Sequence, residues 1–275
     1  MQAERRQLNE LLKSLQGVVV AFSGGVDSSV LLAAGHEALG DSVLAVTGTS
    51  ASLPAHDLDM ARMVSSCLGV RWVTLESGEL ADPRYSANPS NRCYYCKTNL
   101  YKRLLARASE ERLPFVVEGS TADDLQDYRP GIAAARELGI RSPFLELGIG
   151  KEMIRRLARS FGLPNWDKPS SPCLASRIPY GELITPERLQ RIGRSESLLR
   201  EMGFRQLRVR DHGTLARVEL SPEDIVRLVD PGLREAIASA CESVGYTFVT
   251  VDLRGYRTGA MNVALAGISA KVATE

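Results

Sequence analysis

A glycine-rich turn near the N-terminus, with the sequence SGGVDSS at residues 23–29, constrains the fold of this chain more than any other segment. The apolar run GVVVAF at 17–22 precedes the turn, and the apolar-periodic stretch VLLAA at 30–34 follows it. This order predicts a buried strand, a tight turn and a helix. Two glycines let backbone N–H groups close around an anion, and the helix N-terminus adds its partial positive charge. The turn therefore predicts a phosphate-binding loop at the carboxyl end of a strand.

Side chains within the same turn favour a nucleotide bound with a metal ion. The three serines supply hydroxyl donors, and Asp27 is well placed to hold Mg²⁺. No Gly-Lys-Ser/Thr follows, which excludes a Walker A loop, and the GxGxxG fingerprint is absent. The turn resembles instead the SGGxDS signature of the ATP pyrophosphatases (the PP-loop family), which split ATP between its α and β phosphates to adenylate a substrate. An ordinary serine-rich turn before a helix is the alternative. The resemblance implies an ATP phosphate site made of Ser23, Gly24, Gly25, Asp27, Ser28 and Ser29, with Asp27 on Mg²⁺.

The composition is typical of a soluble enzyme. The chain has 275 residues, of which 44% are hydrophobic and 24% charged, enough for one large domain or a large and a small one. A net charge of +1 argues against a dedicated nucleic-acid binder. No run approaches the ~18 apolar residues of a membrane span, so we expect no membrane partner. Residues 1–13 are charged and amphipathic rather than a signal peptide, which predicts a cytoplasmic protein with reduced cysteines.

Strand and helix patterns alternate through the N-terminal part of the chain. Short buried strands are expected at 43–47, 70–75 and 114–118, and helices at 54–68, 93–112 and 152–161. Such alternation predicts an α/β fold, with a doubly wound, mostly parallel sheet and helices on both faces. Ligands should then bind at the carboxyl ends of the strands.

The pattern changes after a proline-rich stretch at 164–181. Helices are expected at 185–202 and 233–244, and strands at 206–210, 216–220 and 247–251. In the first of these helices Thr185 is the predicted N-cap. These elements predict a second, smaller α+β domain. We therefore expect an ATP pyrophosphatase domain at 1–178, and a domain for substrate binding or oligomerisation at 179–275.

Three of the five cysteines form a candidate metal site. Cys93 and Cys96 make a CxxC, which is typical of half a zinc site, a redox dithiol or two core thiols, and Cys173 lies in the segment SSPCLASR. Three thiolates can hold three irons of a 4Fe–4S cluster and leave the fourth iron open to a ligand such as sulfide. Zinc ordinarily needs a fourth protein ligand, and no histidine has ligand spacing to the CxxC. The cluster is favoured over zinc if the three cysteines meet. Cys67 and Cys241 are expected to be core residues.

Seven segments together resemble one PP-loop family, LarE, the sulfur transferase of nickel-pincer nucleotide biosynthesis. They are SGGVDSS (23–29), CYYCK (93–97), DYRPG (127–131), NWDK (165–168), SSPCLASRIPYG (170–181), LRVRDH (207–212) and VDLRGYRTGAMN (251–262). The resemblance implies an adenine nucleotide alpha hydrolase-like fold. It also implies a reaction in which ATP and Mg²⁺ adenylate a carboxylate of pyridinium-3,5-biscarboxylic acid mononucleotide. A sulfur nucleophile then displaces AMP and leaves a thiocarboxylate.

The source of the sulfur divides this family. Some members sacrifice one cysteine, whereas others use three cysteines and a 4Fe–4S cluster that carries an extra sulfide. This chain has Pro172 where the sacrificial cysteine falls, so it resembles the second kind. The resemblance implies that Cys93, Cys96 and Cys173 are catalytic ligands of the cluster, and that sulfide or a sulfur donor protein supplies the sulfur. It further implies a homo-oligomer, with a hexamer as the candidate state.

The resemblance also suggests roles for single residues. Lys97 lies one helical turn after Cys93 and would contact phosphate or the adenylate, with a solvated lysine as the alternative. Ser176 and Arg177 would contact substrate or adenylate. Arg208 and Arg210 alternate with apolar residues, so both point to one face of a strand, where two guanidinium groups suit the substrate phosphate. A solvated strand face is the alternative.

For four carboxylates the sequence favours a metal-binding role less strongly. Glu196 and Glu219 match positions that resemble a family metal site, but the third carboxylate of that site is Arg227 here, which argues against a metal. Asp123 and Asp124 follow a strand end, where acidic residues either approach Mg²⁺ and phosphate or cap a turn.

Three other functions compete with this interpretation. A cluster-dependent tRNA-thiolating PP-loop enzyme shares the chemistry, but the balanced charge counts against it. An ammonia-using synthetase of the NAD or GMP type would need no cysteine triad. A module that only binds ATP or carries a cluster would show no substrate-dependent release of pyrophosphate.

Overall fold

A four-stranded parallel sheet carries the glycine-rich turn. The computed structural model describes residues 1–126 and 129–257. Its larger sheet has the order β3-β2-β1-β4, formed by β1 (Val18–Ala21), β2 (Val43–Thr49), β3 (Trp72–Glu76) and β4 (Phe115–Val117). All three strand pairings are parallel. The predicted α/β class with a parallel sheet is confirmed.

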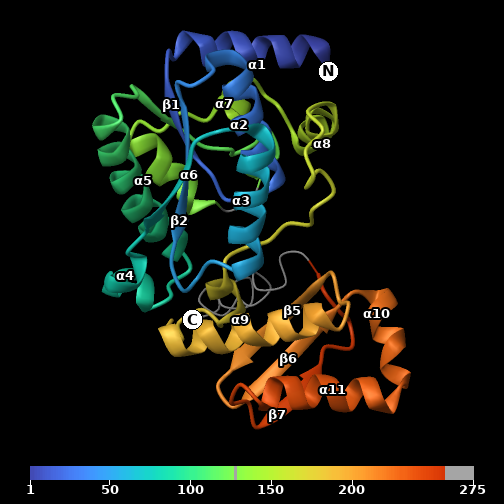
Figure 1. Ribbon diagram of the computed structural model, residues 1–275. Helices are drawn as coiled ribbons and strands as arrows, with labels where there is room; N and C mark the ends of the chain where they lie inside the picture. Colours follow the sequence, from blue (N-terminus) through green and yellow to red (C-terminus); the bar gives the residue numbers. More distant parts are fainter. Residues whose placement is uncertain (127–128, 258–275) are drawn as a thin grey trace, which may run out of the picture. The chain divides into compact units, whose positions relative to one another are not determined.

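Helices cover both faces of this sheet because alternate residues of β1 point to opposite sides. Val18 and Val20 pack into a core with apolar residues of the helices on one face, and Val19 packs into a separate core on the other. The first face is covered by α1 (Gln2–Ser14), α2 (Val26–Leu39), α3 (Ala55–Leu68) and α8 (Lys151–Ser160). The second is covered by α5 (Arg92–Glu110) and α6 (Pro130–Glu137), as Figure 1 shows. The short elements of this part are η1 (Glu79–Ala81), α4 (Pro83–Ser86), η2 (Ala122–Gln126) and α7 (Pro143–Glu146).

A second sheet of three strands, in the order β5-β6-β7, organises the C-terminal part. Strands β5 (Leu207–His212) and β6 (Leu215–Leu220) are antiparallel, and β7 (Phe248–Val251) is parallel to β6. The helical elements here are η3 (Leu174–Arg177), α9 (Pro186–Glu201), α10 (Pro222–Val226), η4 (Arg227–Val229) and α11 (Pro231–Glu242). The Thr185 hydroxyl accepts a hydrogen bond from the N–H of Arg188, as its predicted capping role requires.

The chain divides into two units, and it crosses between them at more than one place. The first unit is Met1–Tyr85 with Asn91–Ser171, and the second is Ser86–Ser90 with the chain from Pro172 onward. The sequence predicts one boundary at residue 178. The structure divides the chain earlier, after Ser171, and adds the excursion Ser86–Ser90.

The excursion belongs to the second unit because its polar groups are satisfied there. The buried Asn88 side chain donates to the carbonyl oxygen of Pro179 at 2.7 Å. The Asn88 carbonyl accepts from the N–H of Gly181, and the Ser86 carbonyl accepts from that of Ile184. No sequence pattern pointed to this contact, since its partners lie roughly 90 positions apart.

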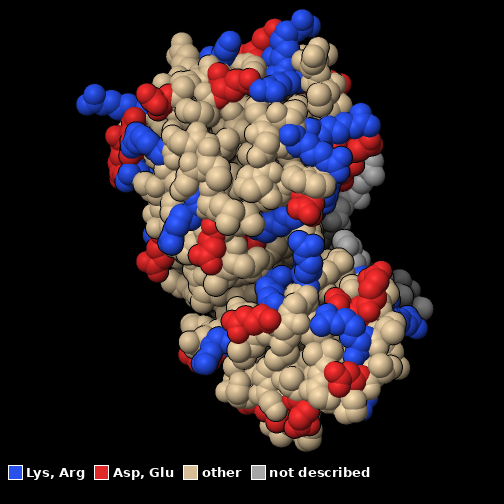
Figure 2. Space-filling model, turned by 45° about the vertical axis from the view of Figure 1, so that its right-hand side comes forward, with Lys and Arg blue, Asp and Glu red and all other residues tan. Residues whose placement is uncertain are grey.

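Two general features bear on function. No helix in the described ranges combines the length and the apolar character that crossing a membrane requires. On the face of the molecule in Figure 2, acidic and basic side chains are interspersed, in keeping with the net charge of +1.

Cys241 is buried as expected, but the expectation for Cys67 was wrong, because its thiol lies on an exposed position of α3.

Candidate active site

The glycine-rich turn, the predicted phosphate-binding loop, joins the end of β1 to the start of α2. Gly24 has a φ of 69°, in the region that favours glycine. A Cβ atom at Gly24 would lie 2.7 Å from the carbonyl oxygen of Asp57 and 2.8 Å from the nitrogen of Ala61. Gly25 is the N-cap of α2. The loop is therefore pressed against the first turns of α3, and only a residue without a side chain fits at position 24.

The serines of the loop divide into one that reaches the surface and two that face inward. Ser23 is exposed, whereas Ser28 and Ser29 are buried. The hydroxyls of Ser28 and Ser29 donate to the Gly25 carbonyl at 3.1 and 2.8 Å, and the Ser28 hydroxyl also accepts from the N–H of Ser23 at 3.3 Å. These bonds fix the turn before a ligand arrives, which is the preorganisation that anion binding favours.

A second turn lies behind the loop and was not singled out from the sequence. The Asn165 side-chain amide donates to the Gly24 carbonyl at 3.1 Å and to the Ser29 hydroxyl at 2.9 Å. The Lys168 ammonium donates to the same carbonyl at 3.1 Å and lies 2.7 Å from a carboxylate oxygen of Asp57. The segment NWDK contributed to the family resemblance, but its spacing alone gave no sign of contact with the loop.

Asp27, the expected Mg²⁺ ligand, lies in the first turn of α2 within a group of charged side chains. Burial raises its pKa to about 6, and the nearby Asp124 carboxylate adds to the increase, while Lys151, Arg155 and Arg129 oppose it. Two carboxylates close to one another are a donor set that Mg²⁺ prefers.

The two acidic residues after β4 have different roles. Asp123 accepts the N–H of Lys151 at 2.6 Å and so caps α8. Asp124 accepts the N–H and hydroxyl of Thr121, while its other oxygen lies 3.1 Å from Arg129 and 3.3 Å from Lys151. Both carboxylates therefore accept backbone N–H groups at a turn or a helix start, which is the capping role that was one of the two expectations. The charge of Asp124 also raises the pKa of Asp27.

Asp27→Asn is expected to stabilise the nucleotide-free protein while removing Mg²⁺-dependent ATP binding. A carboxyl whose pKa is raised by folding costs stability once it ionises. The cost is absent below about pH 4, grows towards pH 6 and is constant above it. Thermal unfolding in a chelator should show a midpoint about 2–4 °C higher for the variant at pH 7.5, and no difference at pH 4. Exposed Asp59→Asn is the control. A lower unfolding midpoint for Asp27→Asn than for wild type at pH 7.5 would contradict the raised pKa of Asp27.

The CxxC occupies the first turn of α5. Cys93 is exposed and Cys96 half-buried. Lys97 follows directly, half-buried, with its ammonium 5.5 Å from the ring centroid of Tyr101. The charges of Tyr101, Cys96 and Glu118 outweigh burial and raise the pKa of Lys97 above its ordinary value. Lys97 is therefore a cation held beside the thiols, although its contact with phosphate stays a prediction.

Cys173 lies in the other unit, directly before η3. Across residues 1–126 and 129–257, no group of three or more His, Cys, Asp or Glu side chains is placed to hold a metal ion. The convergence of Cys173 with the CxxC stays a prediction. Asp127 and Tyr128 of the DYRPG segment, and residues 258–262 of the closing segment, lie outside the described residues.

The segment around Cys173 is held by Arg177, whose side chain is fully buried. Its guanidinium pairs with Glu196 through two hydrogen bonds of 2.9 and 3.0 Å. The remaining nitrogen donates to the carbonyl oxygens of Pro172 at 2.6 Å and Cys173 at 3.1 Å, and to the Ser176 hydroxyl at 2.9 Å. Arg177 thus fixes the backbone that carries Cys173, and its direct contact with substrate stays a prediction.

The two arginines of β5 are both buried, so the solvated strand face is wrong. Arg210 pairs with Glu219 through bonds of 3.0 and 2.8 Å and donates to the Ser176 carbonyl at 2.8 Å. The Arg208 guanidinium lies 4.8 Å from the ring centroid of Tyr256. Glu196 and Glu219, the carboxylates compared with a family metal site, each already have a guanidinium partner.

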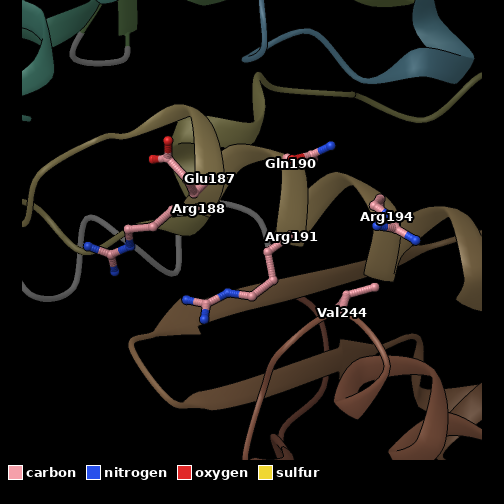
Figure 3. A pocket seen from close by; sticks show the side chains of 6 residues that line it. All are labelled: Glu187, Arg188, Gln190, Arg191, Arg194 and Val244. Carbon is pink, nitrogen blue, oxygen red and sulfur yellow. The ribbon is translucent and has the colours of Figure 1, made fainter.

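A pocket of about 330 Å³ opens beside α9 and was not anticipated from the sequence. Figure 3 shows the residues that line it, namely Glu187, Arg188, Gln190, Arg191, Arg194 and Val244. The fully buried Asp211 accepts hydrogen bonds from Arg188 at 2.9 Å and from Arg191 at 3.1 Å. Two of the pocket's cations therefore stabilise the interior of the second unit.

Comparison with known proteins gives two matches over more than nine-tenths of this chain and one over about half of it. No family model matches the chain. An uncharacterised protein of Synechocystis sp. is 41% identical over 265 residues, which cover 96% of this chain and 99% of that protein. The pyridinium-3,5-bisthiocarboxylic acid mononucleotide synthase of Lactiplantibacillus plantarum is 37% identical over 257 residues, 92% of each chain. A tRNA-specific 2-thiouridylase of Desulforamulus reducens is 27% identical over 196 residues, 56% of this chain and 53% of its own.

Proposed function

The chain belongs to the LarE family of PP-loop sulfurtransferases, and from that membership we propose its reaction. The enzyme adenylates a carboxylate of pyridinium-3,5-biscarboxylic acid mononucleotide with ATP, releases pyrophosphate and replaces AMP with sulfur. The product is a thiocarboxylate for nickel-pincer nucleotide biosynthesis. The observation that carries the proposal is the 37% identity to the Lactiplantibacillus plantarum synthase over 92% of both chains.

The phosphate-binding loop supports the first half of this reaction. A carboxylate is a poor electrophile, so one of its oxygens first attacks the α-phosphorus of ATP, and the bond to the β-phosphate oxygen breaks. Negative charge then builds on the departing pyrophosphate, and N–H groups at the α2 N-terminus are preorganised to stabilise it. Asp27, with Asp124 nearby, would hold Mg²⁺, which neutralises phosphate charge when bound.

Sulfur delivery is the second half of the reaction. A sulfur nucleophile attacks the acyl carbon, the bond to the AMP oxygen breaks, and AMP leaves as a phosphate monoester. We assign Cys93, Cys96 and Cys173 as ligands of a 4Fe–4S cluster, whose open iron would present sulfide. An exposed and a half-buried thiol on one helical turn are a donor pair suited to such a cluster. Lys97 beside them is a cation that would attract the phosphate of the adenylate.

Arg208 and Arg210 are proposed to bind the substrate phosphate. Burial, followed by the nearby Arg177, lowers the pKa of Arg208, so a phosphate would relieve an unfavourable accumulation of positive charge. Arg208→Ala is expected to raise the KM for the mononucleotide about 10–100-fold and to leave the Kd for ATP unchanged. Exposed Arg205→Ala is the control. An unchanged KM in a folded Arg208→Ala protein would exclude the assignment.

The reaction itself is tested by following AMP, pyrophosphate and thiocarboxylate together. The protein, purified without oxygen, is mixed with ATP, Mg²⁺, sulfide and the mononucleotide. We expect pyrophosphate release that depends on the mononucleotide, and a thiocarboxylate product identified by mass spectrometry. Release stimulated by tRNA instead would identify a tRNA-thiolating enzyme, the alternative that the thiouridylase match favours over part of the chain.

A further inference from the structure

One carbonyl oxygen of the phosphate-binding loop receives hydrogen bonds from two side chains that the proposed reaction does not use. The Gly24 oxygen accepts from Asn165 at 3.1 Å and from the Lys168 ammonium at 3.1 Å. Asn165 is buried, and the Lys168 side chain is only 11% exposed. A buried, charge-assisted hydrogen bond to a main-chain oxygen is among the stronger ones that a protein forms.

The position of these donors matters because of the peptide unit that they hold. The Gly24 carbonyl and the Gly25 N–H belong to the same peptide group, and the two point in opposite directions. Donors on the oxygen therefore fix the direction of the Gly25 N–H, and they polarise the group so that this N–H becomes a better donor. In the structure this N–H lies 3.3 Å from the Ser23 hydroxyl, at the anion-binding end of α2.

Asp57 connects the Lys168 contact with Gly24 to a third segment, which ends at Ser171. It is buried, with one carboxylate oxygen 2.7 Å from the Lys168 ammonium and 3.3 Å from His56 Nε2. Its other oxygen accepts from the Ser171 hydroxyl at 2.8 Å. Ser171 is the last residue of the first unit and stands two positions before Cys173. One buried carboxylate thus holds both the lysine behind the phosphate loop and the end of the segment that leads to a proposed sulfur ligand.

We propose that Asn165 and Lys168 are positioning residues for pyrophosphate release, and that Asp57 extends their hold to Ser171, so that one network serves adenylation and sulfur transfer. The inference rests on the proposed function. It adds the residues whose contacts connect the adenylation site with the segment that leads to Cys173. Lys168 acts through the Gly24–Gly25 peptide and Ser171 through the chain that it anchors.

The test separates the half-reactions. Mononucleotide-dependent exchange of labelled pyrophosphate into ATP reports adenylation, and thiocarboxylate formation reports the whole sequence. Lys168→Met should slow the exchange about 10–100-fold, with kcat affected more than KM, because pyrophosphate charge develops in the transition state. Lys168→Arg keeps a cation and should recover most of the rate. Exposed Lys102→Met is the control.

Ser171 and Asp57 provide the second comparison. Ser171→Ala should lower thiocarboxylate formation several-fold more than it lowers the exchange, whereas Asp57→Asn should lower both. Wild-type exchange rates in folded Lys168→Met, or equal losses in the Met and Arg variants, would overturn the role of the lysine. Equal losses of the two activities in Ser171→Ala would overturn the link to sulfur transfer.

A failure of the proposed function has a different signature. Wild-type protein would then show no mononucleotide-dependent exchange at all. The hold on the loop is still tested in that case by calorimetry with inorganic pyrophosphate and Mg²⁺. Binding at least about 10-fold weaker for Lys168→Met than for wild type and Lys102→Met supports the hold, and equal binding overturns it.

Discussion

Gly24→Ala is expected to abolish measurable binding of ATP, with at least a 100-fold rise in Kd. Alanine at a φ of 69° costs about 1 kcal/mol or more. The new Cβ would also lie 2.7 and 2.8 Å from backbone atoms of α3, which cannot rotate away as a side chain could. The loop has to move, and its N–H groups then no longer converge on the phosphates. Titration calorimetry with ATP and Mg²⁺ measures the effect directly.

Gly69→Ala is the matched control for this change. Gly69 has a φ of 65° at the C-cap of α3, and its Cβ would meet nothing within 4 Å. It therefore carries the same backbone cost without the overlap, and should lose about 1 kcal/mol of stability while binding ATP normally. A Gly24→Ala protein that binds ATP within a few-fold of wild type would show that the phosphates do not rest on this loop.

Cys173→Ala is expected to separate the two halves of the reaction. Protein purified without oxygen should contain about four irons per chain, and the variant should lose them, because two thiolates hold a 4Fe–4S cluster poorly. Thiocarboxylate formation should fall to the background rate. Exchange of pyrophosphate into ATP should persist, since the phosphate loop belongs to the other unit. Iron and labile sulfide analyses, together with the exchange assay, measure all three.

Exposed Cys67→Ser is the control and should keep its iron. Wild-type protein without iron would contradict the cluster and return the source of sulfur to a carrier or to a single cysteine. Iron retained in full by Cys173→Ala would instead remove this residue from the ligand set. In either case the adenylation proposed for the phosphate loop would stand.

Local patterns were sufficient to predict much of the fold. The run 17–22, the glycine pair and the apolar stretch after it predicted β1, the loop and α2 because all three are neighbours in sequence. Thr185 was predicted as an N-cap for the same reason. The alternation of strands and helices predicted the parallel sheet, since a strand followed by a crossover helix has few other ways to bury both elements.

The hydrogen bonds and ion pairs that hold the loop and the two arginines could not be predicted from local patterns. The contacts of Lys168 with Gly24 and Asp57 join positions more than 100 residues apart, and neither periodicity nor turn chemistry encodes such pairs. The burial of Arg177 and Arg210 depends on Glu196 and Glu219, which lie on other elements. Charged residues are usually on the surface, so no local pattern indicates that these arginines are buried.

The excursion Ser86–Ser90 has a consequence for the history and engineering of this protein. A gene fragment that begins at Pro172 lacks the five residues whose buried Asn88 completes the second unit. If residues from Pro172 onward were transferred as one continuous segment, the second unit would therefore lack the buried Asn88 side chain. The residues Ser86–Ser90 left in the first unit would lack their hydrogen-bond partners. The two units could be recombined only with three coordinated junctions, so we expect them to have been inherited together and to be produced intact only as a single polypeptide.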